Sequence, residues 1–138
     1  MSKVIVGIDP GVFTGFAVWY PQTKTFLDVT SLNAAEAMIR LQSMQSNEAV
    51  KLVVFEDARL RKWFGTKGRE ALQGAGSIKR DCAILADWLD IIGVPYKAVS
   101  PKAKGAKVDA ARFAKLTGWT GRTNEHARDA AMLVLGMA

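Results

Sequence analysis

Two short runs of apolar, mostly β-branched residues mark the first half of the chain, and each ends in an acidic residue. Residues 3–9 end with Asp9, and residues 51–56 end with Glu56. Continuous apolar runs of this length are typical of strands that are buried on both faces of a sheet. The sequence therefore predicts two core strands, each with a carboxylate at the point where the strand leaves the core.

The residues after the first run predict a hairpin. Pro10 and Gly11 turn the chain, and residues 14–20, rich in aromatic and β-branched side chains, follow at once. Two such strands joined by a tight turn should pair antiparallel. Residues 24–30 have the composition of a third strand, so we expect the hairpin to continue into it.

A helical crossover should join the two core strands. Residues 34–46 have helical spacing, and Ser31 or Asn33 can cap that helix. A strand–helix–strand unit places its two strands parallel in one sheet. Because parallel strands end at the same edge, Asp9 and Glu56 should lie near each other.

The second half of the chain is mainly helical in pattern. The longest helix is expected over residues 71–92, followed by a short strand within 94–99 and a helix over about 107–117. A last helix should open with Thr123 or Asn124 as its cap. The expected inner face of the long helix consists of Leu72, Ala75, Ile78, Cys82, Leu85, Leu89 and Ile92.

Two glycines near the start of the long helix require an explanation. Gly74 and Gly76 each cost about 1 kcal/mol of helix stability relative to Ala. They are justified where another backbone comes close. A partner subunit, a DNA strand or the sheet itself could each be that neighbour.

Composition and charge narrow the class of protein. A chain of 138 residues that is 49% hydrophobic and 23% charged is expected to form one globular domain over residues 1–138. From the predicted strands and helices, we expect an α/β fold with a five-stranded mixed sheet flanked by helices. Its formal net charge of +6 favours a polyanionic partner, nucleic acid before membrane. The lone Cys82 allows no internal disulfide, and we find no signal peptide or membrane span, so we expect a cytoplasmic protein with no membrane partner.

Basic and aromatic residues gather after the second core strand and again around residues 100–107. Each segment is either a solvated loop or a phosphate-binding one, and Trp63 and Phe64 either pack under the core or stack on an unpaired base. The residues that we predict to contact DNA are Arg59, Arg61, Lys62, Trp63, Phe64, Lys67, Arg69, Lys79, Arg80, Lys102, Lys104 and Lys107.

His126 and Asp129 lie three residues apart in the first turns of the last helix. By themselves they are ordinary residues for a helix start. Together with Asp9 and Glu56 they form an oxygen-rich donor set that suits Mg²⁺ or Mn²⁺. In a basic protein, the natural use of such a set is two-metal hydrolysis of a phosphodiester.

These motifs resemble those of the RuvC-type Holliday-junction resolvases, which belong to the ribonuclease-H-like superfamily. Residues 7–11 and 14–18 resemble the first motif of that family, and residues 53–56 resemble the second. Residues 126–131 resemble its final helix, in which two metal ligands stand three apart. The predicted order of elements also agrees, so the resemblance spans nearly the whole chain.

The resemblance implies a ribonuclease-H-like fold and a homodimeric endonuclease that resolves four-way DNA junctions by paired cuts. It assigns Asp9, Glu56, His126 and Asp129 as catalytic ligands of two Mg²⁺ or Mn²⁺ ions. The family often has Asp where this chain has His126, and the short chain resembles phage-encoded members. The resemblance implies a cytoplasmic protein, associated with the nucleoid or, if a phage encodes it, in the cytoplasm of the host. A branch-migration helicase as partner is left open.

Three other functions compete with this interpretation. The nearest is a ribonuclease-H-like nuclease of another substrate class, acting on RNA or on other branched DNA, and a monomeric state would favour it. The second is a nucleotide-binding domain of the actin and sugar-kinase type, which requires two such domains. The third is a non-catalytic DNA-binding scaffold, which the four acidic and imidazole ligand positions oppose.

Overall fold

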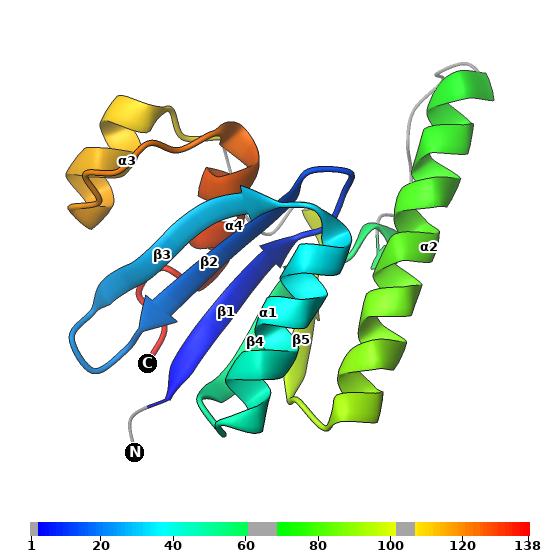
Figure 1. The fold of residues 1–138 in the computed structure, drawn as a ribbon. Helices are drawn as coiled ribbons and strands as arrows, with labels where there is room; N and C mark the ends of the chain where they lie inside the picture. The colour runs from blue at the N-terminus through cyan, green and yellow to red at the C-terminus, as the bar shows by residue number, and fades with distance from the viewer. Residues whose placement is uncertain (1–2, 61–68, 102–106) are drawn as a thin grey trace.

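The computed structural model describes residues 3–60, 69–101 and 107–138, and the side chains of residues 69–75 lie outside that description. Within this part, one five-stranded mixed sheet is flanked by four α-helices (Figure 1). The strands are β1 (Val4–Asp9), β2 (Thr14–Tyr20), β3 (Thr25–Leu32), β4 (Val50–Glu56) and β5 (Tyr96–Val99), and the helices are α1 (Ala34–Ser46), α2 (Arg69–Ile92), α3 (Ala110–Thr117) and α4 (Glu125–Val134). The predicted α/β class and mixed sheet are confirmed.

The sheet has the order β3-β2-β1-β4-β5, with β1 at its centre. The predicted hairpin is present, since β1 pairs antiparallel with β2. The predicted crossover is present too, because β1 pairs parallel with β4 and Ile8 lies opposite Phe55. Asp9 and Glu56 follow these two paired residues, so their backbones leave the sheet side by side at one edge.

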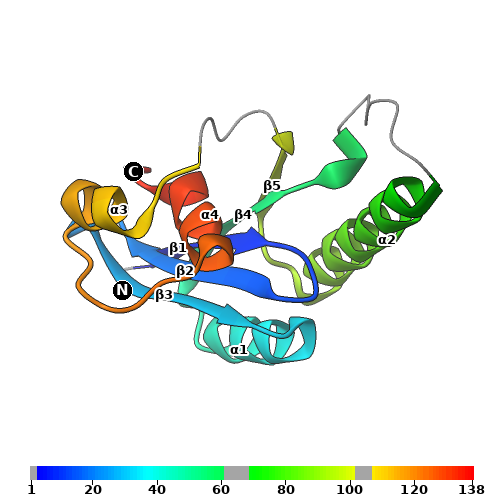
Figure 2. The ribbon, with the colours of Figure 1, turned by 90° about the horizontal axis from the view of Figure 1, so that it is seen from above.

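Helices cover both faces of the sheet (Figure 2). On one face, Leu41 of α1 and Leu89 of α2 are fully buried against the strands. On the other face, Phe113 of α3 and Val134 of α4 are buried in a second apolar cluster. The central strands are therefore apolar on both sides, as their sequence indicates.

Side-chain caps determine where three helices begin. The side chain of Asn33 caps α1 in a capping box with Glu36, and Asn124 caps α4. The expected helix over 107–117 begins only at Ala110, because the side chain of Asp109 accepts a hydrogen bond from the backbone of Arg112 and makes Asp109 the cap.

The N-terminal half of α2 extends past the edge of the sheet in both views (Figures 1 and 2). Cys82, Leu85 and Leu89 face the core as expected, but Ile78 is 42% exposed. Ile78 therefore does not lie on the inner face as expected, because none of the described strands lies beneath that part of the helix. A Cβ at Gly76 would meet no atom of the described residues within 4 Å, so the sheet is not the close neighbour of this glycine.

None of the helices described is both long enough and apolar enough to cross a bilayer.

Candidate active site

Two glycines allow α4 to lie directly on the central hairpin. A Cβ at Gly15 would lie 1.9 Å from the carbonyl oxygen of His126, and a Cβ at Gly7 would lie 2.2 Å from that of Ala130. Both distances are far below van der Waals contact, and the neighbouring atoms are backbone. Only glycine permits this approach, which holds the start of α4 beside the end of β1.

The side chains of Asp9, His126 and Asp129 line one pocket of about 510 Å³. The Nδ1 atom of His126 is 3.8 Å from Oδ2 of Asp9, and Asp129 is 8% exposed. The exposed ring of Phe13 stacks with the imidazole at a centroid distance of 6.1 Å. The structure thus brings three of the four predicted ligands to one pocket, while Glu56 is not among the residues that line it.

Lys107 contributes a positive charge to this pocket. Its Nζ atom lies 2.8 Å from Oε1 of Glu125 and 3.8 Å from Oδ2 of Asp129. The hydrogen bond from Lys107 and the charge of that ammonium hold the pKa of Glu125 below its ordinary value. Sequence reasoning assigned Lys107 to DNA alone, because nothing in the spacing of residues 107 and 129 indicates that they meet.

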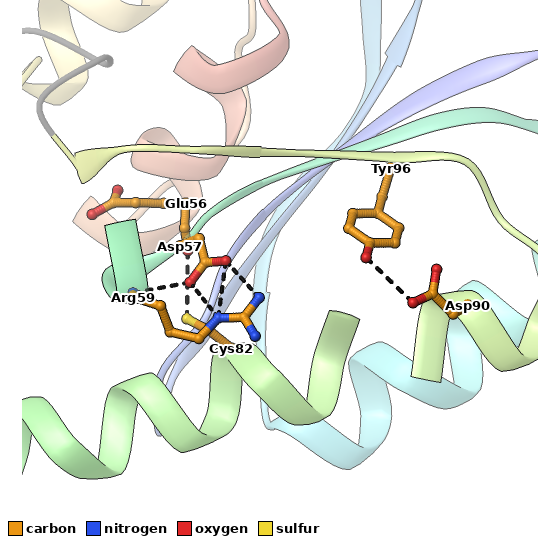
Figure 3. A network of polar contacts seen from close by, with 6 residues as sticks. All are labelled: Glu56, Asp57, Arg59, Cys82, Asp90 and Tyr96. Atoms are coloured by element: carbon orange, nitrogen blue, oxygen red, sulfur yellow. Dashed lines mark hydrogen bonds and ion pairs between the residues drawn. The ribbon is translucent and has the colours of Figure 1, made fainter. Parts of the chain in front are cut away.

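A polar network fixes the end of β4 just beyond Glu56 (Figure 3). Asp57 is 1% exposed, and its carboxylate accepts hydrogen bonds from the backbone N–H, Nε and Nη2 of Arg59. The thiol of Cys82 in α2 lies 3.7 Å from the carbonyl oxygen of Glu56. The Glu56 carboxylate points away from the Asp57–Arg59 pair (Figure 3). Arg59, which we predicted to contact DNA, therefore has a structural partner.

The pKa of Asp57 reflects two opposing effects. Burial acts to raise it, but the hydrogen bonds and the charge of Arg59 outweigh burial, so the pKa lies below its ordinary value of 3.8. A carboxylate with a lowered pKa stabilises the folded state above its unfolded pKa, and this contribution is lost as the pH falls through the folded pKa.

Asp57→Asn should lower the free energy of unfolding by about 1–3 kcal/mol at pH 7, because the amide leaves Arg59 without its charged partner. The difference from the wild type should shrink as the pH falls below 3.8. Urea denaturation at pH 7 and in acid measures both values. A loss of the same size at every pH would show that the charge of Asp57 is not the cause.

Most of the other residues that we predicted to contact DNA lie outside the described part of the chain. Lys79 and Arg80 lie on the N-terminal half of α2, with Arg80 exposed. Outside the described residues lie Arg61, Lys62, Trp63, Phe64, Lys67, Lys102 and Lys104, and so does the side chain of Arg69. Sequence reasoning did not single out Phe13 or Asp81, which line the pocket with Asp9. Only the fold brings these residues together.

The donor set at the pocket fits a hard divalent cation in kind. Asp9 and Asp129 offer carboxylate oxygens, and His126 offers an imidazole nitrogen. In the part of the chain that the structure describes, no group of three or more His, Cys, Asp or Glu side chains is close enough to hold a metal ion. Binding an ion here would therefore require these side chains to draw together.

Comparison with known proteins adds no relative from which the chemistry of this pocket could be transferred. No protein-family model matches the chain, and no curated protein matches it.

Proposed function

We propose that this protein is a metal-dependent endonuclease of the RuvC type, with a ribonuclease-H-like fold, that resolves four-way DNA junctions. The observation that carries the proposal is the meeting of β1, β4 and α4. Parallel pairing brings the ends of β1 and β4 together, and α4 lies against β1, so that Asp9, His126 and Asp129 share one pocket while Glu56 ends the neighbouring strand.

The four proposed ligands come from three elements of the fold. Asp9 and Glu56 come from adjacent strand ends, and His126 and Asp129 come from successive turns of one helix. Bound Mg²⁺ or Mn²⁺ would activate the attacking water and stabilise the leaving oxygen of a phosphodiester. The protein's own contribution is to hold His126 and Asp129 in place beside Asp9, because Gly7 and Gly15 let the backbone of α4 lie directly on the hairpin.

Basic residues on α2 could hold a nucleic-acid substrate near the pocket. The pocket lies between the start of α4 and the middle of α2, which contributes Ser77, Ile78 and Asp81. Lys79 and Arg80 belong to the same turns of α2 but do not line the pocket. Phosphate groups bind such charges without regard to sequence, so a DNA strand could be held there by its backbone.

The substrate class can be tested with a panel of labelled nucleic acids in Mn²⁺. We expect a four-way junction to be cut much faster than a linear duplex of the same sequence or a DNA–RNA hybrid. Preferred cutting of the hybrid would favour the RNA-processing alternative. Resolution of the products on a denaturing gel measures all three rates.

The proposed enzyme needs two active sites, because paired cuts fall on two opposing strands. The helix α2 offers a surface for a second copy of the chain. Ile84, Trp88 and Ile91 follow one another at steps of four and three on one side of it, and Ile91 is 81% exposed. Gly76 is also open to a close neighbour. Exposed apolar side chains such as Ile84 and Ile91 favour association, while Trp88 between them is partly buried against the core.

We therefore expect a homodimer at micromolar concentration in sedimentation experiments, and Ile91→Glu should shift it to a monomer. The change places a charge in the proposed interface, and the exposed position should leave the fold intact. Ile39→Glu, at an exposed apolar position on α1, is the matched control and should remain dimeric. A wild type that is monomeric with and without junction DNA would contradict the dimer.

A further inference from the structure

Lys107 is an exposed residue whose charged end lies beside an almost buried carboxylate. Its side chain is 62% exposed, whereas that of Asp129 is 10% exposed. The Nζ atom bonds to Glu125 at 2.8 Å and lies 3.8 Å from Asp129. The ammonium thus has two acidic neighbours on the first two turns of α4, one at the surface and one inside the pocket.

The charges around this pocket explain why a cation is needed there. Among the described residues, four carboxylates line it, namely Asp9, Asp81, Glu125 and Asp129, together with the ammonium of Lys107 and the imidazole of His126. Neighbouring carboxylates repel one another unless a positive charge compensates them. Lys107 supplies such a charge next to Asp129, the most deeply placed ligand of α4.

The same ammonium must oppose a second cation. An ion that uses Asp129 as a ligand would share that carboxylate with Lys107, and two positive charges at short range repel. Lys107 can yield without leaving the pocket, because Glu125 binds it from the outer side.

We propose that Lys107 is an internal counter-cation of the candidate metal site, which neutralises Asp129 in the metal-free protein and competes with divalent cations for that carboxylate. In this scheme Glu125 is a positioning residue that holds the ammonium when it moves away from Asp129. The inference rests on the proposed function in one respect, since it takes Asp129 to be a metal ligand.

The test is isothermal titration calorimetry with MnCl₂ at low ionic strength, on the whole chain without DNA. Lys107→Met should bind Mn²⁺ about two- to fivefold more tightly than the wild type, the range expected when an exposed ion pair is removed. Lys107→Arg keeps the charge and should bind like the wild type. Lys115→Met removes an exposed lysine from α3, away from the pocket, and should also bind like the wild type.

The outcomes of these titrations distinguish a failure of the counter-cation role from a failure of the metal site. If the wild type binds Mn²⁺ and Lys107→Met binds it no more tightly, the counter-cation role is wrong and the metal site stands. If neither protein binds Mn²⁺, the metal site and the counter-cation role both fall. Lys107→Gln is a second neutral variant, and it must show the same gain as Lys107→Met for the charge to be the cause.

Discussion

Asp9→Asn should abolish cleavage of a four-way DNA junction while the variant still binds the junction. The amide keeps the shape of the side chain but removes the charge that the end of β1 brings to the pocket. We expect the cleavage rate to fall by more than about a hundredfold. Mutation of a residue that only hydrogen-bonds to a metal ligand already lowers metal affinity or activity by about 10- to 100-fold, and loss of a ligand should cost more. DNA affinity should persist, because it depends on basic residues that remain in place.

Cleavage assays and gel-shift titrations on the same junction measure the two effects separately. Asp109→Asn is the matched control, because it removes the same charge at the cap of α3 and Asn caps helices as well as Asp does. It should cut at the wild-type rate. If Asp9→Asn also cuts at that rate, the assignment of Asp9 as a ligand is wrong.

Gly15→Ala should destabilise the protein by about 1–3 kcal/mol or more, the cost of forcing extra atoms into a packed interior. The new methyl group would lie 1.9 Å from the backbone oxygen of His126, so α4 or β2 would have to move. Because such a movement displaces the start of α4, the folded fraction should also lose cleavage activity.

Urea denaturation of Gly15→Ala and Gly76→Ala tests whether the effect depends on that contact. Gly76 lies in α2 with open space around it, so its change to Ala should raise the free energy of unfolding by up to about 1 kcal/mol. A Gly15→Ala protein as stable as the wild type would contradict the close packing of α4 on the hairpin.

Local patterns were enough to predict much of the fold. The apolar runs that end in Asp9 and Glu56 predicted the two core strands, and the tight turn after Asp9 predicted that the first of them, β1, pairs with β2. Asn33 and Asn124, each named as one of two alternatives, proved to be the caps of their helices. These features depend on residues close in sequence, where turn and capping chemistry act directly.

Contacts between distant segments could not be predicted in the same way. Nothing local indicates that Gly15 lies under the backbone of His126, or that Lys107 reaches Asp129. The exposure of Ile78 depends on where the sheet ends, which helical spacing does not reveal. Of the positions expected on the inner face of α2, Cys82, Leu85 and Leu89 are buried and Ile78 is not, while the side chains of Leu72 and Ala75 lie outside the described residues.

The candidate site was predicted as a set of four residues, and the structure groups them unequally. Asp9, His126 and Asp129 line one pocket, and Glu56 leaves the adjacent strand with its neighbour Asp57 tied to Arg59. The sequence placed the acids at strand and helix ends, but the directions of their side chains depend on packing. Lys107 and Phe13 complete the pocket and were recognised as part of it only from the fold.

Metal-dependent junction cleavage is tested by incubating the wild-type protein with a synthetic four-way junction in Mg²⁺, in Mn²⁺ and in a chelator. Each strand is labelled in turn, and the cut positions in each strand are measured. We expect cuts at symmetric positions in two opposing strands when either ion is present, and none in the chelator. A junction that stays intact in both metals with protein in excess over DNA would contradict the account, as would equal cutting in the chelator.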